Sequence, residues 1–425
     1  DEAADVVVSG GDVTAAEAAA IQQISEYNDG ASDYDITDTA AALISATDSV
    51  LDKAGVDTVS VTGGPVLADT GEQLADLSKD VVFDVLDTAD NVAAEVTGSN
   101  GAGDLDEAAD VVVSGGDVST AEAAAIQQIS EYKASPSDYE ITDNVAAVIS
   151  AGDSVIEDGG VTRVEVTGDA SAAQGVDLNA YNANVDFDVR DTAENIADNS
   201  GSLGKADEVF VISGGDAVDV AEAQAIQGLA GYQTGASEYE IEDNAAAIIS
   251  ATDSVLANGN IHVDVTNTVG ASDGAILNSF TADIDFTVSD DAADIAAEVM
   301  GASNAATDLD DAEAVIVESG AAVDVDQAAA IQGISGYVGT MSDIDISDDA
   351  AALISAGDAV LNAEGVDTVT VNATGTGSEV TAQDGALLAG FTADVHFDVV
   401  DDVSDLKAVM GQNDAASYLT EANSI

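Results

Sequence analysis

The amino-acid sequence predicts an α/β protein in which strand–helix units repeat along the chain. The segment Asp1–Val13 returns letter for letter at Asp106–Val118, and weaker copies begin near Asp207 and Asp311. Within each copy, segments that alternate apolar and polar residues precede segments with helical spacing. Repeated units bury their core by stacking on their neighbours, so the repeat is a stronger predictor of the architecture than any local motif.

The repeat divides the chain into four modules and a tail. Equivalent positions at the predicted helix starts, Thr14, Ser119, Asp219 and Asp324, are separated by 105, 100 and 105 residues. We therefore expect modules at 1–105, 106–206, 207–310 and 311–406, and a C-terminal tail at 407–425. Asp1 coincides with a repeat boundary, as expected for a processed product or an excerpt of a longer array.

Each module is expected to contain four strand–helix units. In the first module, strands are predicted at 4–9, 33–37, 58–62 and 81–86, with a turn at Gly10-Gly11-Asp12. Helices are predicted at 14–27, 39–53, 74–77 and 89–96. Thr14 and Glu17 have the spacing of a capping box, which recurs in the other modules. Segments that vary between modules predict loops that contact other molecules, or loops that tolerate drift: 63–72, 168–175, 267–274 and 372–385.

The strands alternate with a period of two, which predicts one buried and one exposed face. In the first module, for example, the apolar residues Tyr34 and Ile36 flank Asp35. A parallel sheet with helices on both faces would have continuously apolar strands instead. We therefore expect a two-layer βα solenoid with a parallel sheet, right-handed crossovers, helices on one face and an open acidic sheet face. The alternative is a tandem array of four small α/β modules.

The charge of the chain limits its partners. It has 83 acidic and 7 basic residues, a formal net charge of −76, yet 46% of its residues are hydrophobic. The apolar content favours a folded protein over a disordered acidic one. Nucleic acid and anionic membranes are excluded because binding them requires clustered lysine and arginine. The acidity fits divalent cation binding or adaptation to high salt, and both predict stability that depends on salt.

Catalysis and membrane insertion find no support in the sequence. Cysteine is absent, which excludes disulfides and zinc–thiolate sites. His262 and His396 lie in different modules, and Ser9-Gly10-Gly11-Asp12 lacks the lysine and spacing of a phosphate-binding loop. No stretch approaches about 20 uninterrupted apolar residues. We therefore predict that the chain is not an enzyme and has no membrane-inserted segment.

Several short strings resemble a known type of repeat. The segments Ile36–Ala41, Phe83–Ala89 and Val189–Ala193 resemble the V-x-D-T-A-A-N βα repeats of very large bacterial secreted and cell-surface proteins, of adhesin, surface-layer or matrix type. The resemblance implies an extracellular, adhesive or matrix role. The calcium-binding nonapeptide that often accompanies such repeats is missing, and Gly10-Gly11-Asp12 is only a fragment of it.

An aspartate follows the second and the fourth strand of every module. Stacked units would bring these carboxylates to one edge, where cations could bridge them. The favoured interpretation is helix capping, since a carboxylate beside a helix N-terminus accepts backbone N–H bonds. These residues are Asp38, Asp87, Asp143, Asp191, Asp243, Asp290, Asp348 and Asp401.

Outward acidic residues on the strands are the candidate metal ligands. If the strands stack in register, Glu140, Glu165 and Asp188 form a ladder at a spacing of about 4.8 Å. Like charges about 5 Å apart repel by roughly 1 kcal/mol in water, and a hard cation such as calcium would reverse that sign. Glu240 and Asp264 repeat the pattern in the third module.

Two alternatives compete with a calcium site on this face. Arg163 and Arg190 lie on the same face, so the acids could form an internal salt-bridge lattice instead. A solvated charged face is the simplest interpretation. His262 lies near the third-module acids and has no recurrent partner in the sequence.

The sequence thus predicts an extracellular, acidic structural repeat protein. It would form a rigid spacer or a self-assembling surface layer or filament at the cell surface, stabilised by calcium or by high salt. Head-to-tail self-association would dock residues 4–9 against the last unit of another copy, with 415–425 capping or mediating that contact, and cell-surface or matrix components as further partners. The alternative is an adhesin-type module that contacts a glycan or a cationic partner through the variable loops or the acidic sheet face.

Overall fold

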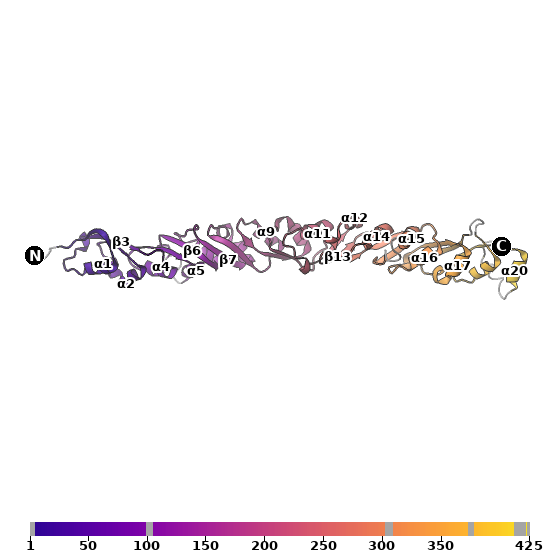
Figure 1. Ribbon diagram of the computed structural model, residues 1–425, viewed down its shortest axis with the longest axis horizontal. Coiled ribbons are helices and arrows are strands. Elements are labelled where there is room, and N and C mark those ends of the chain that lie inside the picture. Colours follow the sequence, from indigo (N-terminus) through magenta and orange to yellow (C-terminus); the bar gives the residue numbers. More distant parts are fainter. Residues whose placement is uncertain (1–4, 99–104, 302–308, 373–377, 412–421, 423–425) are drawn as a thin grey trace. The chain divides into compact units, whose positions relative to one another are not determined.

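The computed structural model describes residues 5–98, 105–301, 309–372, 378–411 and 422. The chain forms two compact units: residues 1–191, 198–210 and 229–233, and residues 192–197, 211–228 and 234–425. In both units small sheets alternate with helices, which confirms the predicted α/β class (Figure 1). The separate small sheets also fit the alternative of a tandem array of small modules. Most of the predicted tail lies outside the described residues.

In the first unit, strands pair in chain order. The first sheet contains β1 (Ser9–Val13), β2 (Asp33–Asp38), β3 (Val56–Val61) and β4 (Val81–Val82). The second contains β5 (Asp84–Asp87), β6 (Asp110–Val118), β7 (Asp138–Asn144), β8 (Val161–Thr167) and β9 (Val185–Asp186). Every neighbouring pair in these two sheets is parallel. Strand β10 (Asp188–Asp191) pairs with β11 (Glu208–Val211).

Helices connect these strands. They are α1 (Ala15–Gln22), α2 (Ala40–Ala46), α3 (Asp48–Leu51), α4 (Ala68–Ala75), α5 (Ala89–Thr97), α6 (Thr120–Ile126), α7 (Val145–Ala151), α8 (Asp153–Ile156) and α9 (Ala172–Ala180). Helix α10 (Ala193–Asn199) lies at the boundary between the units. Short 3-10 turns lie at Asp29–Ala31, Ser200–Ser202, Thr234–Ala236 and Gly339–Met341.

The second unit also alternates strands and helices, but its last strands do not pair in chain order, since β18 pairs with β20 and β19 with β21. Its strands are β12 (Glu238–Asp243), β13 (Asn260–Val265), β14 (Ile284–Asp285), β15 (Thr287–Asp291), β16 (Ala314–Glu318), β17 (Ile344–Asp348), β18 (Val366–Val371), β19 (Glu379–Val380), β20 (Val395–His396) and β21 (Asp398–Val399). Its helices are α11 (Val220–Gln227), α12 (Ala245–Ser250), α13 (Asp253–Leu256), α14 (Ala271–Asn278), α15 (Ala292–Met300), α16 (Val325–Gln332), α17 (Ala350–Ala356), α18 (Asp358–Leu361), α19 (Ala382–Leu388) and α20 (Val403–Met410). All of the strand pairs are parallel.

The predicted alternation and helix caps are confirmed. In β7, Tyr139 and Ile141 are buried while Glu140 between them is exposed. Thr14 and Glu17 form a reciprocal capping box at α1, and the equivalent pairs do so at α6, α11 and α16. The core is built from alanine, valine, isoleucine and leucine, with phenylalanine and tyrosine at fixed positions of the strands.

The predicted turn at Gly10-Gly11-Asp12 is wrong, because these residues belong to strand β1. The strand predicted at 4–9 is also displaced, since Val6 makes only an isolated bridge. In β6 the equivalent Gly115 and Gly116 have φ of 70° and 99° and interrupt the register. Glycine adopts such angles without strain, so the pair forms a bulge. The bulge lets one half of β6 pair with β5 and the other half with β7.

The single helix predicted at 39–53 is divided into α2 and α3 by Thr47, which has φ 63° and ψ 158°. Glycine occupies the equivalent break in two other modules, at Gly152 and Gly357. A β-branched residue in this region is strained. The sequence pattern concealed the break because the apolar spacing continues across it.

The segments predicted as variable loops contain the starts of helices. Helix α4 begins at Ala68, inside the predicted loop 63–72, and α9, α14 and α19 begin inside 168–175, 267–274 and 372–385. Residues 373–377 lie outside the described part. The helix predicted at 74–77 overlaps only the end of α4. The starts of these helices were not predicted, because each helix contains a glycine, which usually disfavours helix. Here Gly71 packs with its Cα side against Phe83 and Val85, where a Cβ would come within 3.1–3.2 Å of both side chains.

Candidate functional site

The candidate site lies at equivalent outward positions of three adjacent strands in each module. In the second module, Glu140 of β7 lies opposite Arg163 of β8, and Glu165 of β8 lies opposite Asp186 of β9. The predicted ladder of Glu140, Glu165 and Asp188 is therefore wrong in register by two residues. A shift of two keeps every side chain on its face, so alternation alone does not fix the register. The register that forms instead places the buried Ile141 of β7 opposite the buried Val164 of β8.

Asp188 lies on a different strand from the one expected. The fourth strand of the module stops after Asp186 and resumes as β10 at Asp188, which pairs with β11. One Asp188 carboxylate oxygen accepts a hydrogen bond from the Glu208 N–H at 3.1 Å. Asp188 is therefore separated from Glu140 and Glu165 by a change of pairing partner.

Arg163 connects the acidic residues of the second module. Its Nη1 lies 2.9 Å from a Glu165 carboxylate oxygen and 3.6 Å from one of Glu140, and its Nε donates to Asp186. The hydrogen bond and charge of Asp186, followed by those of Glu165, raise the pKa of Arg163. One guanidinium thus bridges β7, β8 and β9. The salt-bridge lattice that the sequence offered as an alternative is present around Arg163.

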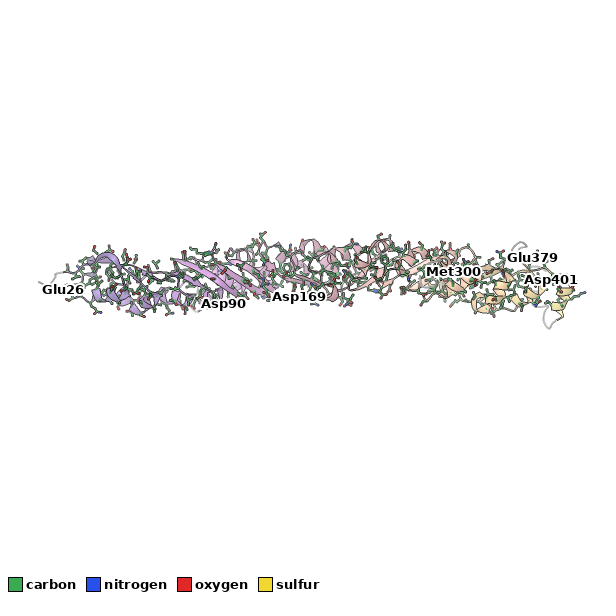
Figure 2. The ribbon with its side chains drawn as sticks, viewed as in Figure 1. Glu26, Asp90, Asp169, Met300, Glu379 and Asp401 are labelled. Carbon is green, nitrogen blue, oxygen red and sulfur yellow. The ribbon has the colours of Figure 1, made fainter. Side chains whose placement is uncertain are left out.

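Arg190 makes a separate set of contacts. Its Nη1 lies 3.6 Å from Asp169, which is labelled in Figure 2. The guanidinium carbon is 5.3 Å from the centre of the Phe210 ring, within the range of a cation–π contact. Arg190 therefore does not join the cluster around Arg163.

In the third module, a histidine occupies the position of Arg163. Glu240 of β12 lies opposite His262 of β13, and Asp264 of β13 lies opposite Asp285 of β14. The His262 Nε2 atom is 3.2 Å from an Asp285 carboxylate oxygen and 3.5 Å from one of Asp264. A hydrogen bond with Asp264, partial burial and the Asp264 charge raise the pKa of Glu240. Four potential ligand groups thus meet on three strands.

A groove adjoins this cluster within the second unit. Its volume is about 380 Å³, and Glu240 and His262 form part of its wall. Ile212, Gly214 and Tyr239 line it as well. The imidazole and one carboxylate of the cluster are therefore reachable from solvent.

Modules one and four carry hydroxyl groups at the corresponding positions. Asp35 accepts hydrogen bonds from Thr58 Oγ1 at 2.6 Å and from the Thr58 N–H at 3.0 Å. In module four, Thr368 Oγ1 donates to Asp345. His396 lies opposite Thr370, and its Nε2 is 3.9 Å from the largely exposed Asp394. Among the described residues of these two modules, no ionic cluster joins three strands.

The junction aspartates bind helix N-termini, which confirms the favoured capping interpretation and refines it. Each accepts a hydrogen bond, between 2.9 and 3.2 Å long, from the first N–H of the helix in the preceding unit. The partners in order are Ala15, Ala68, Thr120, Ala172, Val220, Ala271, Val325 and Ala382. Most of these aspartates also accept the N–H of the following residue. They therefore join consecutive units as well as capping helices.

These hydrogen bonds change the ionisation of two junction aspartates. Partial burial alone would raise the pKa of Asp87, but bonds from Asn91, Ala68 and Thr88 outweigh it and lower the pKa. Burial of Asp143 is likewise outweighed, by bonds from Thr120 and Asn144. The charged form is thus favoured in the native protein, as expected for a carboxylate that accepts several N–H bonds.

Three further acidic clusters bring carboxylates close enough to hold a metal ion. Two of them lie at the starts of α15 and α20, around Asp290 and Asp401, where the carboxylates already cap helices (Asp401 is labelled in Figure 2). The third contains Asp343, Asp345 and Asp367, where partial burial and the two neighbouring charges raise the pKa of Asp343. Nothing in their geometry identifies calcium.

A partly buried polar contact that the sequence did not predict recurs between helices and strands. Gln127 Nε2 donates to Tyr139 Oη at 2.8 Å and to the Val155 carbonyl oxygen at 3.1 Å, and it therefore ties α6 to β7 and α8. Gln22 and Gln227 make the same pair of contacts. The available signal was the dipeptide Ile-Gln, which ends the first helix of all four modules.

Comparison with known proteins does not assign the chain to a family. No protein-family model matches the chain, and a search of curated proteins found no significant match. In the described ranges, no helix combines the length and the apolar character needed to cross a lipid bilayer.

Proposed function

We propose that this chain is an extracellular structural protein whose βα units stack as a solenoid, with a role in a spacer, surface layer or filament and none in catalysis. The observation that carries the proposal is a comparison of nearly identical segments. Residues 16–27 and 121–132 have the same sequence, yet Ile24 is 41% exposed and Ile129 only 3%. Burial at this position therefore depends on the neighbouring unit and not on the segment itself.

The unit that covers the second segment is the last unit of the first module. Strand β5 pairs with β6, from Asp84 opposite Asp110 to Asp87 opposite Val113, and α5 packs against α6. Val111 and Val113 are fully buried in that junction, whereas the equivalent Val6 and Val8 are only partly buried. We name the face formed by β1 and α1, with Val6, Val8 and Ile24, the leading face.

The last unit of the fourth module shows the complementary change. In α15, Ala292 and Val299 are 1% and 2% exposed, because α16 of the next module packs against them. The equivalent residues of α20 are Val403 and Met410, which are 67% and 55% exposed. We name the face formed by α20 and β21 the trailing face. At the module junctions within each unit, a leading face and a trailing face bury each other.

We propose that the leading face of one copy binds the trailing face of another, which gives head-to-tail assembly. A contact between two different faces need not close on itself and therefore favours filaments. The net charge of −76 opposes association, so assembly requires screening by monovalent salt or neutralisation by divalent cations such as calcium. The acidic clusters support cation binding without specifying the ion.

Sedimentation of matched variants tests this assembly. Ile24→Asn places a polar side chain in the leading face, whereas Ile276→Asn alters an equally exposed isoleucine on α14, outside both faces. In high salt or millimolar calcium we expect the wild type and Ile276→Asn to associate with rising concentration and Ile24→Asn to remain monomeric. A wild type that stays monomeric under all these conditions would overturn the proposal.

The adhesin-type alternative is supported by a different feature. The groove beside Glu240 and His262 combines apolar and acidic walls, which suits a small cationic ligand. Binding of such a ligand to a monomer, abolished by a substitution of the exposed Ile212 in the groove, would favour this function over assembly.

A further inference from the structure

The third module places three carboxylates around a position that holds a fixed positive charge in the second module. Glu140, Glu165 and Asp186 surround Arg163, and the same strand positions in the third module carry Glu240, Asp264 and Asp285 around His262. Arginine is charged at every accessible pH, whereas histidine carries a charge only when it is protonated. The two clusters thus share an arrangement of acids and differ in their cation.

The third module has no permanently charged basic side chain of its own. The seven lysine and arginine residues of the sequence include none between 207 and 310. Ion pairs of the cluster in the described residues involve only His262.

The donor atoms are spaced for a metal ion. One ligand atom each from His262, Asp264 and Asp285 lies within 4.8 Å of the other two, and the Nε2–oxygen distances are 3.2 and 3.5 Å. Ligands about 2.0–2.2 Å from a tetrahedral zinc ion lie about 3.3–3.6 Å apart. Glu240 of β12, which lies opposite His262 in the strand register, offers a fourth ligand. Only small side-chain movements separate this arrangement from a coordination sphere.

We propose that Glu240, His262, Asp264 and Asp285 bind one divalent transition-metal ion of the zinc class. The ion bridges β12, β13 and β14, as Arg163 bridges β7, β8 and β9. An imidazole nitrogen favours zinc and similar ions over calcium and magnesium, which prefer oxygen ligands. With four protein ligands the site is structural. This inference rests on the strand register and the charges of one module, and it is independent of the proposed assembly.

The two histidines of the chain make a direct test available by NMR of the protein labelled with ¹⁵N-histidine. We expect about one equivalent of Zn²⁺ to shift the ring signals of His262 in millimolar calcium and high monovalent salt, which saturate weak carboxylate sites. His396, whose Nε2 atom is 3.9 Å from Asp394, is the internal control and should keep its signals. Equal shifts of both histidines, or no shift of His262, would overturn the proposal.

Exchanging the two central residues gives a matched pair of variants. His262→Arg should copy the second-module cluster and weaken Zn²⁺ binding by at least about tenfold. Losing a metal ligand lowers the affinity at least as much as losing a residue that hydrogen-bonds to a ligand. Arg163→His should create a second site and raise the stoichiometry to about two ions per chain. The zinc-induced rise in melting temperature should disappear in His262→Arg. Unchanged binding by His262→Arg would show that the carboxylates alone hold the ion and would contradict the proposal.

Discussion

The second and third modules share a fold and a core but differ on the exposed face of the sheet. Gly175 and Gly274 each pack against a valine, a leucine and a phenylalanine at corresponding positions. On the exposed face, the same backbone positions carry Arg163 in one module and His262 in the other. The comparison indicates that core packing restricts the inward residues of each unit, whereas the outward positions tolerate side chains of different charge.

The largest effect is expected from the shared core. A Cβ at position 175 would lie 2.8 Å from Leu203 Cδ2 and 2.9 Å from Val189 Cγ2, so Gly175→Ala must displace both side chains. We expect a loss of about 1–3 kcal/mol in the free energy of unfolding. Gly201→Ala is the control, because a Cβ there meets nothing within 4 Å. Urea unfolding measures both variants, and equal losses would mean that the core does not constrain this position.

A smaller effect, which depends on pH, is expected at the junction aspartates. The native pKa of Asp143 is lowered, so its stabilisation is complete above the unfolded pKa of about 3.9 and is lost as pH falls through the native value. We expect Asp143→Asn to lose about 1 kcal/mol at neutral pH and to show a weaker decline in stability below pH 4. The exposed Asp177→Asn is the control. Unfolding curves from pH 7 to 3 test the difference.

Glu240 should show the opposite dependence on pH. Its raised native pKa means that ionisation costs stability at neutral pH, and this cost is relieved as pH falls through the native pKa. In chelator, Glu240→Gln should therefore be at least as stable as the wild type at pH 7 and lose that advantage in acid. The equivalent Glu140→Gln, which removes a partner of Arg163, should gain nothing at pH 7. The melting temperatures of Glu240→Gln and Glu140→Gln, each compared with that of the wild type in chelator, test this expectation.

The smallest gain is expected at the strained break between α2 and α3. Thr47 has φ 63° where two other modules have glycine, so Thr47→Gly should relieve the strain and stabilise the protein by about 1 kcal/mol. The flexibility of glycine in the unfolded chain and the lost contact with Ser49 offset part of the gain. Ser49→Ala measures that contact alone. A destabilised Thr47→Gly would show that the angle causes no strain.

The sequence predicted features that depend on neighbouring residues in the chain. The capping box of Thr14 and Glu17 and the burial of Tyr139 and Ile141 follow from spacings of three and two residues, and both are present. The sequence also named Glu240 and Asp264 as candidate ligands, and the structure brings them into contact. Whether they bind a metal stays a prediction.

Features that depend on long-range packing were not predictable in the same way. Alternation is unchanged by a shift of two, so the opposition of Glu140 and Arg163 needed the packing of Ile141 against Val164. Asp285 could not be recognised as a member of the cluster until that register was known. Likewise, Asp143 was expected to cap a nearby helix, but its partner at Thr120 belongs to the preceding unit.

Electron microscopy of the purified chain tests the central claim that stacked modules form a structural assembly. Samples in chelator, in millimolar calcium and in matched monovalent salt separate cation binding from screening. The account predicts filaments or sheets once the net charge of −76 is screened or neutralised, with a repeat set by one copy of the chain. Isolated particles under all three conditions would contradict it.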